Sequence, residues 1–452
     1  VCIAAGSGPF QSCQRAHSGY CSTGQEDQAD LGWTLSYLGL DHTGSVNQSF
    51  RYKQISELHW NFISKLGRSS KPIFVQIAKQ VVNLNPTELR LPSRAWKVKL
   101  VGEGADDAGG VFDDTITEMC QELQSGVVEL LIHTPNSSAD VGSNTDRFLL
   151  NSAAASDDHM VQFRFLGILM AVAIRTKKPL DLHLAPWVWK QMCCIPLAAA
   201  DLEEVDLLTY RSLQGILHLD NSVINEENFT VMIPLDSFVA HSADGTLVPV
   251  IPGGHNVPLT FSNRNDYVER ALYYRLHEMD RQVAAVREGM SSIIPVPLLS
   301  LLTARQLEQL VCGLPEVSVE MLKKVVRYRD ITDSHQLIGW LWQSLEEFTN
   351  EERVLFLRFV SGRSRLPSNP ADITQKFQII KVDRPVNGLP TAQTCFFQLR
   401  LPPWRRPALP TLSFKNALQK PTGDVTDTTS MFLYSLCIQH DQCSLITETN
   451  DS

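Results

Sequence analysis

The longest largely apolar stretch, FRFLGILMAVAI at residues 163–174, constrains the fold more than any other part of the sequence. A membrane-spanning helix needs roughly 20 apolar residues, so this stretch is too short to cross a bilayer. Phe163, Leu166, Met170 and Ile174 recur at the spacing of one helical face. We therefore expect a helix that is buried in a protein core.

Helical patterns continue on both sides of this stretch. Apolar spacing and helix-ending residues predict further helices at 111–126, 266–290, 304–315 and 337–348. Alternating patterns predict strands at 96–103, 377–382 and 395–401. Residues 1–50 are rich in Gly, Ser, Gln and Asp and show little periodicity, so we expect a loop or disordered lead-in there.

Composition narrows the functional classes. With 43% hydrophobic and 20% charged residues the chain has an ordinary globular composition, and its net charge of -9 gives no indication of a nucleic-acid partner. The ten cysteines contain no C-x-x-C pair and fit neither a disulfide framework nor a zinc site. We expect reduced thiols and a cytoplasmic protein without metal or cofactor. Residue 1 is Val, so we also expect a piece of a longer protein.

The glycine-rich segment GEGADDAGG at residues 102–110 invites comparison with a phosphate-binding loop. It lacks the required lysine, since Gly110 stands at that position, and two acidic residues in the loop would repel a phosphate. We interpret it as a tight turn between a strand and a helix. The sequence also contains no G-x-S-x-G or H-E-x-x-H motif.

Cys395 lies where a loop containing Pro390 enters a predicted strand, in the sequence LPTAQTCFF. A buried, unreactive thiol is one interpretation, because such cysteines are common. The other interpretation is a thiol that a partner can reach. A free thiol has a pKa of about 8.5, which leaves a few per cent thiolate at neutral pH. That amount is too small for attack on an amide but suffices for exchange with a thioester. A papain-like protease is disfavoured, because only His440 follows Cys395.

A series of motifs occurs in a characteristic order: WKVKLVGEGADDAGGVFDD (96–114), FRFLGILMAVAIRTKKPLDLHLAPWVWKQM (163–192), LTYRSL (208–213), NDYVERAL (265–272), REGMSSIIP (287–295), LEQLVCGLP (307–315), WLWQSLEEFTNEERVLFLRFVSGRSRLP (340–367) and LPTAQTCFFQLRLP (389–402). In this order the motifs resemble the HECT-type ubiquitin ligase domain, and they look most like that of the large HERC proteins. The resemblance covers about residues 91–403.

The resemblance implies an α+β fold with two lobes. A mostly helical N-terminal lobe would span 91–326, with a subdomain at 203–262 that receives a ubiquitin-conjugating enzyme. A hinge near Val326–Asp330 would lead to a small α/β C-terminal lobe at 327–403. Residues 1–90 would form an N-terminal extension that is partly disordered, and residues 404–452 an atypical tail.

The resemblance also implies the site residues and partners. Cys395 falls on the catalytic cysteine of the family, which takes ubiquitin as a thioester and passes it to a substrate lysine. Thr394 precedes it as in the family, while Gln393 stands where many members have histidine. Tyr210 and Leu213 match a motif beside the groove that binds the conjugating enzyme. The expected partners are therefore the conjugating enzyme, ubiquitin and protein substrates.

The chain departs from the family pattern after Pro403. Three prolines lie within residues 403–410, and the expected amphipathic helix is missing from the sequence that follows. Without that helix, Phe and Leu residues of 395–401 would be exposed and Cys395 poorly positioned. We therefore predict reduced transfer activity, and the alternative function is a module that binds a conjugating enzyme without efficient transfer.

Overall fold

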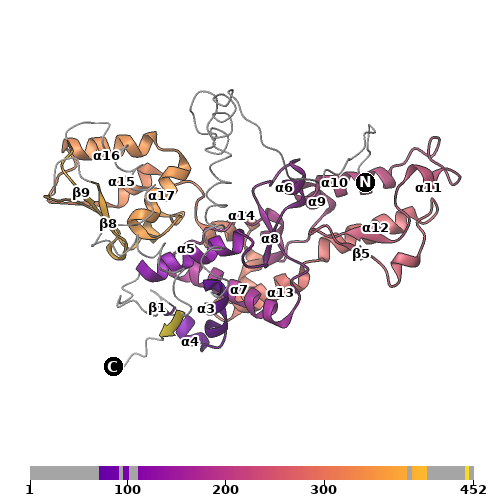
Figure 1. The fold of residues 1–452 in the computed structure, drawn as a ribbon, viewed down its shortest axis with the longest axis horizontal. Helices are drawn as coiled ribbons and strands as arrows, with labels where there is room; N and C mark the ends of the chain where they lie inside the picture. The colour runs from indigo at the N-terminus through magenta and orange to yellow at the C-terminus, as the bar shows by residue number, and fades with distance from the viewer. Residues whose placement is uncertain (1–70, 91–94, 101–109, 384–388, 405–442, 447–452) are drawn as a thin grey trace, which may run out of the picture. The chain divides into compact units, whose positions relative to one another are not determined.

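The computed structural model describes residues 71–90, 95–100, 110–383, 389–404 and 443–446. Their buried hydrophobic side chains form two clusters, one from Ile73 to Cys312 and one from Val317 to Trp404. The first belongs to a mostly helical part and the second to a small part with a four-stranded sheet (Figure 1). The predicted α+β class is confirmed. The expectations for residues 1–70, for most of the 102–110 turn and for most of the tail lie outside the described residues.

The first described helix, α3 (Ile73–Val81), belongs to the first hydrophobic cluster. Its N-cap residue, Pro72, makes no side-chain cap. Glu122 of α5 (Gly110–Gln124) takes that role, because its two carboxylate oxygens accept the N–H groups of Ile73 and Phe74, each at 2.8 Å. The short helix α4 (Pro86–Leu89) follows. Residues 71–89 are thus part of the core rather than of an extension, contrary to the boundary expected at residue 90.

The predicted buried helix is α7 (Asp157–Thr176). Ser156 caps its N-terminus through the N–H of His159, and Lys177 ends it in the left-handed conformation. Helix α13 (Asp280–Ser291) packs against it, with glycines at the crossing (Figure 1). A Cβ on Gly167 would lie 1.9 Å from the carbonyl oxygen of Val286, and a Cβ on Gly289 would lie 1.9 Å from that of Arg164. The two backbones therefore touch directly.

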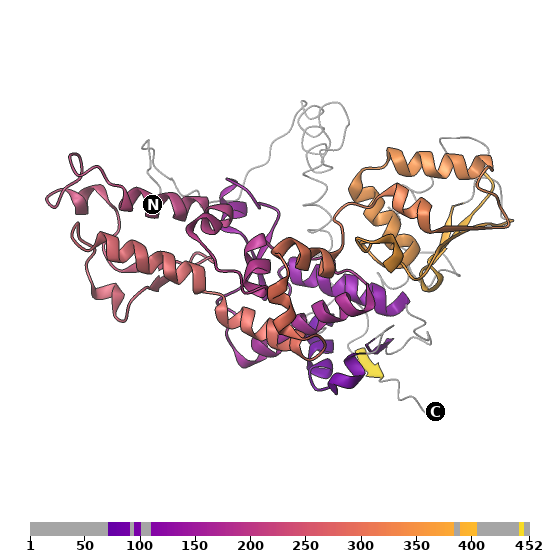
Figure 2. The ribbon, with the colours of Figure 1, turned by 180° about the vertical axis from the view of Figure 1, so that it is seen from behind.

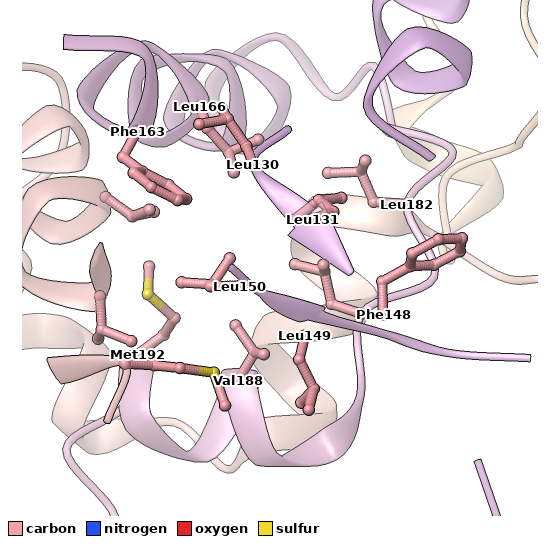
Figure 3. Close-up of a cluster of buried hydrophobic side chains, with 14 of the residues drawn as sticks. Leu130, Leu131, Phe148, Leu149, Leu150, Phe163, Leu166, Leu182, Val188 and Met192 are labelled. Atoms are coloured by element: carbon pink, nitrogen blue, oxygen red, sulfur yellow. The ribbon is translucent and has the colours of Figure 1, made fainter. Parts of the chain in front are cut away.

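A short antiparallel pair of strands lies beside α7, made by β2 (Leu131–His133) and β3 (Phe148–Leu150). Figure 3 shows Leu150 directed toward Val188 and Met192 of α8 (Pro186–Met192). Between the strands lies α6 (Pro135–Ala139), which Thr134 caps through the N–H of Ser137.

Residues 199–277 form four α-helices, a 3-10 helix and a hairpin. They are α9 (Ala199–Val205), α10 (Leu207–Leu217), α11 (Phe229–Met232), β4 (Val239–His241) with β5 (Leu247–Pro249), the 3-10 helix η1 (Gly254–Asn256), and α12 (Arg264–His277). Their buried side chains join the first cluster. The long helix predicted over 266–290 is interrupted between His277 and Asp280. The side chains of Glu278 and Met279, between the two helices, are buried.

The change from the first cluster to the second comes between Cys312 and Val317, after the 3-10 helix η2 (Val296–Leu301) and α14 (Ala304–Cys312). The segment expected as the hinge instead forms strand β6 (Val326–Arg329), which pairs in parallel with β7 (Phe377–Lys381). Its alternate residues Val326 and Tyr328 pack against the second cluster. The segment expected as the hinge therefore belongs to the sheet of the second part.

The second part contains α15 (Val319–Val325), α16 (Gln336–Glu347), α17 (Asn350–Ser361) and the 3-10 helix η3 (Pro370–Asp372). Its sheet has the order β6-β7-β9-β8, with β8 (Thr391–Gln393) antiparallel to β9 (Gln398–Leu401) and the other pairs parallel. Figures 1 and 2 show the three helices to one side of this sheet.

Two strands outside this sheet complete the description. Strand β1 (Lys97–Leu100), predicted from the sequence, pairs antiparallel with β10 (Cys443–Ile446) of the tail. Across the described residues, no helix combines the length and apolar character that a membrane span requires.

Candidate functional site

Cys395 lies at the tip of the hairpin formed by β8 and β9. The three residues Thr394–Phe396 form the 3-10 helix η4, and the strand begins only at Gln398. The strand predicted over 395–401 is thus shorter than expected. The cause is Phe397, whose positive φ of 47° breaks the extended conformation, with its N–H donating to the carbonyl oxygen of Thr394 at 3.1 Å. Cys395 therefore belongs to a turn.

The backbone of this turn is anchored on both sides of the thiol. The Gln375 side chain donates to the carbonyl oxygen of Cys395 at 2.8 Å, and the N–H of Gln378 donates to that of Phe397 at 2.9 Å. The Phe397 ring is buried and stacks on Phe377 at a centroid distance of 5.0 Å. A phenylalanine at positive φ is costly, and this burial holds it there.

The side chains of the turn divide between core and surface. Thr394 and Phe397 are buried, Cys395 is half-buried, and Phe396 is 54% exposed. Gln393, at the end of β8, is half-buried. The structure thus places Thr394 where it supports the turn and leaves Cys395 accessible to solvent.

The other cysteines of the described residues differ from Cys395. Cys120, Cys193 and Cys312 are buried, and burial raises the pKa of each thiol, that of Cys312 to about 12. Cys194 is exposed, in the turn after α8. Among the cysteines whose side chains the structure describes, only Cys194 and Cys395 are not buried.

Helix α5 lies against the turn that carries Cys395 and against α17. Arg363 pairs with Asp113 at 2.7 Å, and Arg358 pairs with Glu118. Thr117 donates from its hydroxyl to the carbonyl oxygen of Gly362 at 2.8 Å. Ion pairs and a buried hydrogen bond therefore fasten the end of α17 to α5.

Two carboxyl groups near this junction have shifted pKa values. Burial raises the pKa of Asp114 to about 7, although Arg358 opposes the shift. Burial also acts on Asp181, but a hydrogen bond with His183 and the charge and hydrogen bond of Arg365 lower its pKa to about 2. Arg365 and Asp181 lie 2.7 Å apart.

The residues expected beside a partner groove lie on α10. Tyr210 is half-buried, but Leu213 is only 5% exposed and belongs to the first hydrophobic cluster. Leu213 therefore has almost no surface to offer a partner. Leu208 and Leu217 of the same helix are 45% and 39% exposed. Leu213 and Ile216 are three residues apart, and this helical spacing of apolar residues indicates the core face of α10.

Seven exposed apolar side chains belong to α10, α12 and the residues that connect them. They are Leu208, Leu217, Val223, Val231, Met232, Leu247 and Tyr273. Single exposed apolar residues are ordinary, but a group of them in one segment is typical of a binding surface. Within the ranges that the structure describes, no group of His, Cys, Asp and Glu could hold a metal ion.

Comparison with known proteins identifies the family. Residues 117–419 match the model of the HECT-domain (ubiquitin-transferase) family. The chain belongs to the HECT-domain family. The E3 ubiquitin-protein ligase HERC2 of Mus musculus is 44% identical over 338 residues, which are 74% of this chain and 7% of that protein. HERC2 of Homo sapiens is 45% identical over the same shares. The E3 ubiquitin-protein ligase ptr1 of Schizosaccharomyces pombe is 30% identical over 66% of this chain and 9% of that protein.

The resemblance to HECT domains, and to those of HERC proteins in particular, is thereby confirmed. The chain spans less than a tenth of the length of these three relatives. The matched residues include the Cys395 turn and the segment between α10 and α12.

Proposed function

We propose that this HECT domain accepts ubiquitin from a conjugating enzyme as a thioester on Cys395 and transfers it to lysines of protein substrates. The observation that carries the proposal is a solvent-accessible thiol on a turn whose backbone is anchored by Gln375 and Phe397. An anchored backbone with an accessible sulfur suits a nucleophile that must meet a large partner. The family description, ubiquitin-transferase, supports the same chemistry.

Two thioester reactions make up the transfer. In the first, the Cys395 thiolate attacks the carbonyl carbon of the terminal ubiquitin residue, the new C–S bond forms, and the thiolate of the conjugating enzyme leaves. In the second, the amine of a substrate lysine attacks the same carbon, an amide forms, and the Cys395 thiolate leaves while the amine loses its proton. The first reaction exchanges one thioester for another, so an unactivated thiol suffices.

Thr394 takes a positioning role in this proposal. It is buried at the start of the turn, and its carbonyl oxygen accepts the N–H of Phe397. Replacement that disturbs this bond would move the sulfur of Cys395. Gln393, at the end of β8, offers an amide where a titratable side chain is common in the family.

The exposed apolar residues between α10 and α12 support docking of the conjugating enzyme on residues 203–262. We assign the contact to Leu217 and Tyr210, which are seven residues apart and so share one face of α10, rather than to the buried Leu213. The two hydrophobic clusters support a division into two lobes, with the boundary between Cys312 and Val317.

A module with impaired transfer is the second candidate function, and the tail after Pro403 favours it. The packing of the described part of the small lobe argues in part against this candidate. Leu399 and Leu401 are buried, Phe396 is exposed, and Trp404 fills a place in the second cluster. Exchange of residues 404–452 for a family-type C-terminus tests the candidate. A large gain in transfer rate would favour impairment, and equal rates would exclude it.

Loading of the chain tests the main proposal. The chain is mixed with a ubiquitin-loaded conjugating enzyme and separated on a non-reducing gel. We expect an adduct that disappears with a reducing agent and is absent from Cys395→Ala. Cys194→Ala is the matched control, because it removes another exposed thiol, and it should load normally. An adduct that survives in Cys395→Ala would refute the assignment.

A further inference from the structure

Helices α9 and α10 are joined by a single residue, Asp206, which is buried. One oxygen of its carboxylate accepts the N–H of Thr209 at 3.0 Å and so caps α10. The other accepts from the guanidinium of Arg275 on α12 at 2.6 Å. The same side chain therefore starts α10 and ties it to α12.

Arg275 continues the connection toward the rest of the core. Its side chain is 1% exposed, and its Nε donates to Glu278 at 3.0 Å. The second oxygen of Glu278 accepts from the backbone of Ala243 at 3.2 Å and lies 3.5 Å from the hydroxyl of Ser152, just before α7. The buried chain of charges thus runs from the start of α10 to the segment that precedes α7.

Asn136 holds the same junction through a separate set of hydrogen bonds. Its side chain is buried, and its Oδ1 accepts the N–H of Leu207, the first residue of α10, at 2.7 Å. Its Nδ2 donates to the carbonyl oxygens of Ser143 at 3.0 Å and Glu204 at 3.1 Å. Asn136 lies on α6, between β2 and β3, so the end of α9 and the start of α10 are both bonded to that region.

These contacts are geometrically demanding. A buried ion pair is weak evidence for stability, because desolvation offsets the attraction, but it permits few alternative arrangements. Loss of one partner leaves a buried charge with fewer bonds, and the local structure shifts to satisfy it. Helix α10 has only Leu213 and Ile216 fully buried. Its orientation therefore depends on the contacts at its first turn.

We propose that Asp206, Arg275 and Asn136 are positioning residues that fix α10, and with it Tyr210 and the exposed Leu217, in the orientation that receives the conjugating enzyme. The inference rests on the proposed function. It adds that residues remote from Cys395 determine the affinity for the loaded conjugating enzyme and leave the chemistry at the thiol unchanged. The two steps of the transfer should therefore respond differently to changes at the junction.

The experiment compares Asp206→Asn and Asn136→Asp in the full chain. Asp206→Asn keeps an oxygen for the cap but removes the charge that faces Arg275. Asn136→Asp keeps the oxygen for Leu207 and removes the donor to Glu204. Loading of Cys395 is measured against the concentration of loaded conjugating enzyme, and discharge of preloaded chain to free lysine is measured separately.

We expect the KM for the loaded conjugating enzyme to rise about tenfold in each variant, the usual effect of a lost hydrogen bond to a charged or buried group. The maximal loading rate and the discharge rate should stay within about twofold of the unaltered chain. Glu288→Gln is the matched control, since it breaks the exposed ion pair between Glu288 and Arg164 in the same lobe. It should leave the KM unchanged.

Several outcomes would overturn the inference. An unchanged KM in both folded variants would do so, and so would equal losses in loading and discharge, which indicate a general structural role. If Asp206→Asn fails to fold, Asn136→Asp decides alone. If the unaltered chain forms no thioester, the proposed function fails. The Kd for the conjugating enzyme is then measured directly in place of the KM. A weaker Kd in the variants then supports the inference, and an equal Kd or absent binding overturns it.

Discussion

Replacement of Gly167 by alanine tests the central packing of the larger lobe. In an exposed helix this change is stabilising, because alanine is favoured over glycine by about 1 kcal/mol. In α7 the added Cβ would lie 1.9 Å from the carbonyl oxygen of Val286 and 2.9 Å from the N–H nitrogen of Met290. Contacts under 3.0 Å essentially never occur for a real Cβ, so α7 and α13 would have to separate by about 1 Å.

The magnitude follows from what that separation disturbs. Overpacking a dense core typically costs about 1–3 kcal/mol and occasionally more. Here the obstacle is helix backbone rather than a flexible side chain, and Phe163, Leu166 and Met170 on the same helix are fully buried. We expect the upper end of that range, which leaves a net loss of about 2 kcal/mol after the gain in helix propensity. In a lobe of this size that corresponds to a fall in Tm of about 4–8 °C.

The assay is thermal and urea unfolding of the full chain, followed by circular dichroism. Gly215→Ala is the matched control, because Gly215 lies inside α10 and an added Cβ there would meet nothing within 4 Å. The control should gain up to about 1 kcal/mol. Gly289→Ala should lose stability as Gly167→Ala does, since the contact is reciprocal. Equal gains in Gly167→Ala and Gly215→Ala would refute the close crossing.

Three further predictions concern charge and the thiol turn. Burial raises the pKa of Glu122 to about 7, so the folded state binds the proton of this carboxyl group more tightly than the unfolded state does. Up to about 3 kcal/mol of stability should therefore be lost as pH rises from about 5 to about 8. Glu122→Gln should flatten this pH dependence in unfolding measurements. Asp181 has a lowered pKa of about 2, so it contributes about 2 kcal/mol to the free energy of unfolding above pH 4, and this contribution is lost as pH falls toward 2. Arg365→Gln should reduce the loss of stability in acid. An unchanged midpoint of acid unfolding would contradict the pairing of Arg365 with Asp181. Phe397→Ala should cost about 3–5 kcal/mol and slow loading of Cys395, because it removes the ring that stacks on Phe377; equal loading rates would contradict the anchoring role.

The elements that the sequence predicted well are those with a strong local pattern. Helix α7 was predicted because its apolar residues recur over many turns, and α14 because Gly313 and Pro315 end it. The position of Cys395 between an incoming loop and a strand was also recognisable from the prolines and the alternation that follows. Periodicity and breaker residues act locally, so they can be read without the fold.

The errors came where tertiary contacts decide. The strand was expected to start at Cys395, but Phe397 takes a positive φ that only its burial against Phe377 makes tolerable. The resemblance assigned Val326–Arg329 to a hinge, and no strand was predicted there from the sequence. Four residues are a weak strand signal, and the pairing with β7 is remote in sequence. The motif around Leu213 could not distinguish the core face of α10 from its exposed face without the neighbouring helices.

The central claim is that the sulfur of Cys395 carries ubiquitin, and Cys395→Ser tests it most directly. A serine hydroxyl in the same place would form an oxygen ester, which a reducing agent does not cleave. The chain is incubated with ubiquitin-loaded conjugating enzyme, treated with reductant, digested, and analysed by mass spectrometry. The account predicts that residue 395 carries the ubiquitin C-terminus in the variant, while the unaltered chain loses its adduct on reduction. Ubiquitin esterified to any other position of the variant, with residue 395 unmodified, would contradict it.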